Sequence, residues 1–319
     1  MCYNIKNRSF GARMKHFIYI AINIVLPIFL LTGIGFLIQK IFRLDLKSIN
    51  KLNIYVFVPA ILFVKIYETE ISWNMLLTAL GYITVIMLAM YVLAFAASKA
   101  LRLDKSKRMV FLNAMIFFNS GNYGIPLISL AFPGNPVALT GQIMIMLIQN
   151  ITNNTIGVFQ ASHGRGDIRK AFRNMLIMPS MYVFIIAGIV KLADVRIPDP
   201  IMIPLNNIAD GFIAMALISL GIQLADIKFR FELPPIAAAS IIRLVIAPLI
   251  GAAILKIAGA DGVLAKSLIL GVATPVAVTT AIIAKEFDNS PEFAAEIVFS
   301  TTLLSALTVS AVIFFLDFL

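Results

Sequence analysis

Two amides, a hydroxyl and two glycines interrupt an apolar stretch that is long enough to cross a bilayer. They lie in the run 119–124, Asn-Ser-Gly-Asn-Tyr-Gly, and Pro126 follows two residues later. A backbone broken inside hydrocarbon leaves N–H and C=O groups unpaired, which costs several kcal/mol for each group. Such a break is stable only where it is buried in protein or lines a cavity. Interrupted membrane helices build ligand sites near the bilayer midplane, so this run is the first candidate site.

A second interruption lies in the C-terminal half, where Thr274 precedes Pro275 and the hydroxyls of Thr279 and Thr280 follow. A lone proline would be weak support for a site, because kinked membrane helices are common. Two interruptions at matching positions of the two halves indicate a site more strongly. Helix N-termini at such breaks can bind a carboxylate without a buried lysine or arginine. The alternative is that these residues pack the crossing and satisfy one another.

A third polar cluster adds to the candidate substrate-binding residues. Gln149, Asn150, Asn153 and Asn154 share one face of a helix at these spacings. A polar face in a membrane helix points to a cavity or to a neighbouring helix, and both alternatives stay open. The complete candidate set is Asn119, Ser120, Gly121, Asn122, Pro126, Thr274, Pro275, Val276, Thr279, Gln149, Asn150 and Asn153.

Two charged residues are candidates for coupling or gating. Arg243 lies inside an apolar stretch and Asp226 directly follows one, and charges at membrane depth are often functional. Snorkelling or ion pairing is the alternative for Arg243, and an interfacial position is the alternative for Asp226. Neither interruption contains Asp or Glu, which proton relays and charged sodium sites usually use. A proton and a sodium ion both stay open as the coupling ion.

The composition places these residues in a polytopic membrane protein. The chain has 319 residues, of which 60% are hydrophobic and 13% are charged, whereas soluble domains carry about 25% charged residues. Its net charge of +10 comes from short basic loops, so topology explains it better than nucleic-acid binding. With one cysteine and two histidines, neither an internal disulfide nor a Cys/His metal site is expected. We expect no cofactor and no enzymatic activity, since no nucleophile–base pair or phosphate loop is present.

Ten apolar stretches are long enough to be membrane spans. They cover approximately residues 17–38, 49–67, 73–98, 108–131, 137–159, 173–192, 203–225, 234–257, 263–285 and 292–316. The pattern predicts a polar tail at 1–16, a five-helix repeat at 17–160, a connecting loop at 161–172 and a second five-helix repeat at 173–319. Five spans per half would invert the second repeat relative to the first. The first span is expected to be retained, and Met14 is an alternative start.

The distribution of lysine and arginine predicts the orientation. Loops after the first, third, fifth, seventh and ninth spans carry most of the basic residues, which places them in the cytoplasm and both termini outside. The basic tail before residue 16 argues against this orientation.

Several motifs resemble the auxin efflux carrier family, which includes plant PIN-type carriers and bacterial malate and malonate carriers. They occupy residues 27–35, 119–127, 220–224, 274–287 and 300–305, so the resemblance extends over nearly the whole chain. The compact length fits the bacterial form. Two departures stand out. Phe118 replaces the proline of PIN-type carriers, and Thr279 and Thr280 stand where bacterial relatives often carry an asparagine.

The resemblance implies an all-α fold of ten helices in two inverted repeats, with broken helices 4 and 9 crossing. It also implies a scaffold of helices 1, 2, 6 and 7, a mobile transport unit of helices 3–5 and 8–10, an elevator-type movement and a homodimer. The implied function is transport of a small organic anion across the inner membrane. A sodium-coupled bile-acid-type symporter and a membrane sensor that binds without transport are the alternatives.

Overall fold

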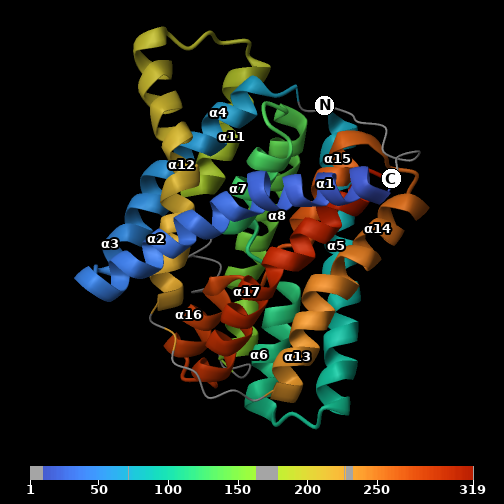
Figure 1. The fold of residues 1–319 in the computed structure, drawn as a ribbon. Helices are drawn as coiled ribbons and strands as arrows, with labels where there is room; N and C mark the ends of the chain where they lie inside the picture. Colours follow the sequence, from blue (N-terminus) through green and yellow to red (C-terminus); the bar gives the residue numbers. More distant parts are fainter. Residues whose placement is uncertain (1–9, 71, 163–178, 226, 228–232, 319) are drawn as a thin grey trace.

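The computed structural model describes the chain except residues 1–9, 71, 163–178, 226, 228–232 and 319 (Figure 1). The regular secondary structure of the described residues is helical, and their β structure is limited to one isolated antiparallel bridge between Phe118 and Val276. Six of the described helices are long and apolar enough to cross a membrane, and two shorter apolar helices accompany them. The expected all-helical, polytopic membrane fold is confirmed at this level, whereas the inverted repeat stays a prediction.

The N-terminal half consists of helices joined by π-helical turns. These elements are α1 (Phe10–Ile20), η1 (Ala21–Val25), α2 (Leu26–Phe42), α3 (Leu46–Leu52), η2 (Asn53–Phe57), α4 (Val58–Glu68), α5 (Trp73–Ala100), α6 (Lys105–Ile116), η3 (Ser120–Gly124), α7 (Ile125–Ala131), α8 (Pro136–Thr152), η4 (Asn153–Gly157) and α9 (Val158–Ala161).

The described part of the C-terminal half is also helical and contains one π-helical turn. Its described elements are α11 (Pro179–Leu192), α12 (Asp199–Ala225), α13 (Leu233–Ile241), η5 (Ile242–Ile246), α14 (Ala247–Ile257), α15 (Gly262–Val272), α16 (Val278–Glu286) and α17 (Pro291–Leu316). Helical segments thus lie in all ten of the stretches that the sequence indicates as spans.

Four of the five described π-helical turns end two residues before a proline. The prolines are Pro27, Pro59, Pro126 and Pro248, which follow η1, η2, η3 and η5. A proline in a helix lacks an N–H and clashes with the carbonyl four residues earlier. The wider π turn takes up that clash and lets the helix continue. These turns also carry Asn53, the polar run at 120–122 and Arg243, so the same distortion brings polar side chains to the interior.

Helices α2 and α12 cross with their backbones in contact (Figure 1). A Cβ atom added at Gly35 would lie 2.1 Å from the carbonyl oxygen of Ile218, and one added at Gly221 would lie 1.8 Å from that of Thr32. Only glycine permits this approach. At the other end of the molecule α1 packs against α17, and Nε2 of His16 lies 2.6 Å from Oδ2 of Asp317. The described ends of the chain therefore lie on the same side.

Candidate functional site

The two interruptions meet as a pair of short antiparallel extended segments. Asn119 N donates to the carbonyl oxygen of Pro275 at 2.8 Å, and Ala277 N donates to that of Phe117 at 3.1 Å. Each segment therefore pairs backbone groups of the other. These hydrogen bonds offset part of the free energy that unpaired backbone groups would cost inside a membrane. The ends of α6 and α15 and the starts of η3 and α16 all come together at this crossing.

Side chains of neighbouring helices bind the remaining backbone groups of the breaks. The amide of Gln149 accepts from Phe118 N at 3.1 Å and donates to the carbonyl oxygen of Ile116 at 3.1 Å. Gln142 donates to the carbonyl oxygen of Ser120 at 2.7 Å. On the other break, Thr301 Oγ1 accepts from Val276 N at 3.2 Å. Gln149, a candidate ligand residue, thus uses both ends of its amide on the protein itself.

A cavity of about 400 Å³ opens beside the crossing. Its polar lining is dominated by side-chain amides, which both donate and accept hydrogen bonds. The lining residues with polar side chains are Asn50, Asn53, Asn119, Ser120, Asn122, Gln149, Asn150, Asn153, Asn154, Ser180, Gln223, Thr279 and Glu286. Among the described lining residues Glu286 is the single charged one, and no lysine, arginine or histidine is present.

Most of the residues predicted to bind substrate line this cavity. They are Asn119, Ser120, Gly121, Asn122, Gln149, Asn150, Asn153 and Thr279. Pro126, Thr274, Pro275 and Val276 do not line it. Pro126 lies in the first turn of α7, and the hydroxyl of Thr274 donates to the carbonyl oxygen of Gly271. Pro275 and Val276 contribute backbone bonds to the crossing. These four residues shape the break without facing the cavity.

Three amide contacts join different helices across the cavity. Asn53 donates to Oδ1 of Asn122 at 3.0 Å, and Asn153 donates to Oγ1 of Thr279 at 3.0 Å. At the rim, Gln223 donates to Oδ1 of Asn50 at 2.9 Å. Both alternatives for the polar face of α8 and η4 are therefore realised, because Gln149 and Asn153 bond to other elements and also line the cavity.

Three asparagines that line the cavity have a buried side-chain atom without a partner among the described residues, namely Oδ1 of Asn53, Oδ1 of Asn153 and Nδ2 of Asn119. The unpaired donor among them belongs to Asn119. Its side chain is only 7% exposed, and its Nδ2 group has no hydrogen-bond partner among the described residues. Buried polar groups are nearly always paired, and an unpaired one loses free energy. A donor left unpaired in the wall of a cavity is a natural contact for an acceptor on a ligand.

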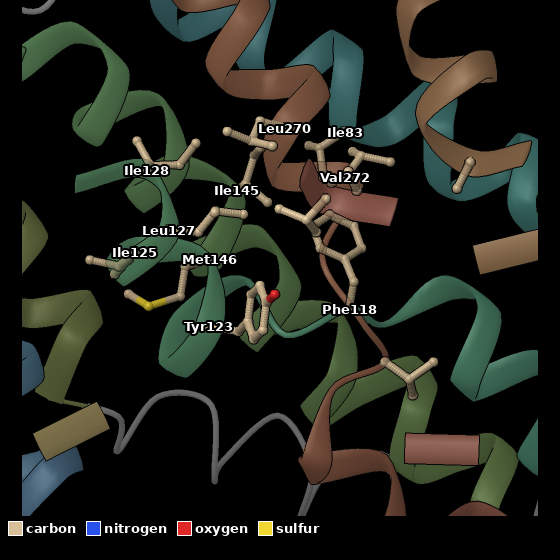
Figure 2. Close-up of a cluster of buried hydrophobic side chains, with 14 of the residues drawn as sticks. Ile83, Phe118, Tyr123, Ile125, Leu127, Ile128, Ile145, Met146, Leu270 and Val272 are labelled. Atoms are coloured by element: carbon tan, nitrogen blue, oxygen red, sulfur yellow. The ribbon is translucent and has the colours of Figure 1, made fainter. Parts of the chain in front are cut away.

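Arg243 does not line the cavity but lies against Phe118, which does. Its guanidinium donates to the carbonyl oxygen of Met115 at 3.1 Å and to that of Val272, and it covers the ring of Phe118 at 4.6 Å. Alternate side chains of an extended segment point to opposite faces, so Phe118 and Phe117 diverge. Figure 2 shows Phe118 within the apolar cluster that contains Ile83 and Val272. Asp226, the other candidate for coupling or gating, lies outside the described residues.

Sequence reasoning missed several residues of the cavity. Asn50, Asn53, Gln223, Ser180 and Glu286 were not among the candidates, although all of them line it. The available signal was the presence of amides inside or at the edge of apolar stretches. Which of these amides would face the same cavity depends on how helices distant in the sequence pack.

The geometry and the comparisons with known proteins agree on the class of this molecule. A multi-pass helical membrane protein with a polar cavity at two interrupted helices has the architecture of a membrane transporter. The chain belongs to the membrane transport protein family, whose model matches residues 20–172 and 167–313. A protein described as an uncharacterized transporter from Methanothermobacter thermautotrophicus is 23% identical over 289 residues, which cover 88% of this chain and 93% of that protein. The family is consistent with the resemblance to auxin efflux carriers.

Proposed function

We propose that this protein is a secondary transporter of the bacterial auxin efflux carrier type that moves a small organic anion across the inner membrane. The substrate class is a carboxylate similar to malate, malonate or an auxin. The protein would use no cofactor, and its partners would be the substrate, a possible coupling proton or sodium ion, the lipid bilayer and a second copy of the chain.

The observation that carries this proposal is the unpaired, buried Nδ2 donor of Asn119 in the wall of the cavity. Two helices, η3–α7 and α16, begin at the crossing and contribute Ser120 and Thr279 to the lining. The first backbone N–H groups of a helix have no partner within that helix and carry the positive end of its dipole. A carboxylate at this point would accept from Asn119 and from these N–H groups.

The packing of the helices supports an elevator-type movement. Contacts are extensive between α2 and α12 and between α4 and both α11 and α12, which would form the scaffold. They are also extensive between α8 and α15, between α5 and both α6 and α14, and between α16 and α17, which would form the transport unit. The cavity lies between the two groups, since Asn53 of η2 and Gln223 of α12 face Asn119 and Thr279 across it.

The test is flux in proteoliposomes, preceded by a thermal-shift screen of malate, malonate and indole-3-acetate with and without sodium at two pH values. A ligand that binds only the folded protein raises its apparent stability. We expect at least one acid to stabilise the protein and to be transported. Stabilisation by sodium alone would favour a sodium-coupled symporter, and binding without flux would favour a sensor. No effect of any acid on a folded protein would contradict the proposal.

A further inference from the structure

Arg243 is a fully buried cation for which the described residues provide no anion. Its exposed fraction is 0%, and it forms no ion pair with a described residue. Its Nε group also has no hydrogen-bond partner there. Burying an uncompensated charge is strongly unfavourable, so buried arginines are normally paired with a carboxylate or a ligand.

The position of this cation among the helix ends changes the electrostatic potential at the crossing. Two helix N-termini of about +0.5 charge each and two C-termini of about −0.5 each meet there, and these dipole ends nearly cancel. The guanidinium binds carbonyl oxygens at the C-terminal ends of α6 and α15, at Met115 and Val272. It therefore offsets the two negative ends and leaves the N-termini that face the cavity with a net positive potential.

We propose that Arg243 is the counter-charge of the candidate site, a positioning residue that makes the cavity selective for anions without touching the ligand. This inference rests on the proposed function and explains how a cavity can hold an anion when Glu286 is the one charged residue among its described lining residues. Through its contacts with both broken helices and with Phe118, Arg243 also fixes the register in which the two N-termini face the cavity.

The test compares acids with their neutral amides, malonate with malonamide and indole-3-acetate with indole-3-acetamide. Binding to the full-length protein is measured by thermal shift and calorimetry. At a separation of about 10 Å and an effective dielectric constant of about 20, one unit charge changes anion affinity roughly tenfold. We expect the wild type to prefer the acid that it binds best to its amide by about this factor. Arg243→Met removes the preference, and Arg243→Lys, which keeps the charge, retains it.

Ser240→Ala is the matched control, because Ser240 is buried three residues before Arg243 and its hydroxyl donates to the carbonyl oxygen of Ile236 in its own helix. This variant is expected to keep the acid preference. A folded Arg243→Met protein that keeps the wild-type preference overturns the counter-charge role and leaves the transport proposal intact. If Arg243→Met does not fold, the wild type and Arg243→Lys provide the test. If either protein binds the acid and its amide with equal affinity, the counter-charge role is overturned. If no acid binds the folded wild type, the proposed function fails as well.

Discussion

Asn119 and Asn113 are two buried amides, six residues apart, whose Nδ2 groups differ in their hydrogen bonding. Asn113 donates from Nδ2 to the carbonyl oxygen of Gly157 at 2.9 Å and ties α6 to η4. Asn119 lines the cavity, and its Nδ2 lacks a partner among the described residues. Replacement by alanine should therefore lower the stability of the protein at Asn113 and its ligand affinity at Asn119.

We expect Asn119→Ala to fold with nearly wild-type stability and to lose about tenfold or more in acid affinity, the value of a hydrogen bond to a charged group. Asn113→Ala should lose about 1 kcal/mol of stability, because it removes the hydrogen bond between α6 and η4, and should keep its acid affinity. Thermal unfolding with and without the acid measures both quantities. Equal loss of acid affinity in the two variants would argue against a ligand contact at Asn119.

Gln149 is the residue whose replacement should disturb the crossing most directly. Gln149→Leu leaves Phe118 N–H and the Ile116 carbonyl without their partner, at a cost of about 1–3 kcal/mol for each group. The melting temperature should therefore fall sharply even without ligand. The control is Gln223→Leu, which removes one hydrogen bond at the cavity rim to Asn50 and should cost much less. Similar melting temperatures for the two variants would show that the interruption near Phe118 does not depend on the two hydrogen bonds of Gln149.

The contact between α2 and α12 is the closest approach of two helices that the glycine positions reveal. In Gly221→Ala the new Cβ would lie 1.8 Å from the carbonyl oxygen of Thr32 and 2.7 Å from Phe36 N. Both are backbone atoms, so the helices themselves must separate. Overpacking of this kind costs about 1–3 kcal/mol or more, and we expect a lower unfolding temperature with increased aggregation.

Gly188→Ala provides the matched control, because no atom lies within 4 Å of the Cβ position at Gly188 in α11. This variant should be as stable as the wild type or slightly more stable, since alanine favours a helix over glycine. A Gly221→Ala protein that unfolds at the wild-type temperature would mean that α2 and α12 do not need this contact.

Local chemistry explains which features of the site the sequence could predict. Pro126 and Pro275 with their neighbouring polar residues mark both breaks, because proline and unpaired backbone are costly in any membrane helix. The roles of Gln149 and Arg243 were not predictable in this way. Both depend on carbonyl groups that become available only when α6 and α15 end side by side. The π turns before Pro27, Pro59 and Pro248 were missed for a related reason, since a proline alone does not decide between a kink and a π turn.

Two pairs of hydroxyl groups allow the proposed movement of the transport unit relative to the scaffold to be tested. The distance between the two oxygen atoms is almost the same in both pairs. Thr69 Oγ1 and Thr140 Oγ1 lie 2.8 Å apart and join the end of α4 in the proposed scaffold to α8 in the transport unit. Ser106 Oγ and Ser290 Oγ lie 2.7 Å apart, and both belong to the transport unit. Hydroxyls this close place the Cβ atoms near the distance that a disulfide requires. Cys2 is the one native cysteine, so it is replaced first.

If the transport unit slides past the scaffold, a disulfide between Thr69→Cys and Thr140→Cys must stop transport, because it fixes one group to the other. We expect this double variant to transport the acid when reduced, to lose flux on oxidation while still binding the acid, and to recover with a thiol reductant. The oxidised Ser106→Cys, Ser290→Cys protein should transport as fast as the same protein with its thiols reduced, since its cross-link lies within one moving unit.

Unchanged flux through the oxidised Thr69–Thr140 protein, with the disulfide verified by mass spectrometry, would refute the elevator movement and leave the transport proposal standing. Loss of flux in both oxidised proteins would instead show that the transport unit must change shape internally.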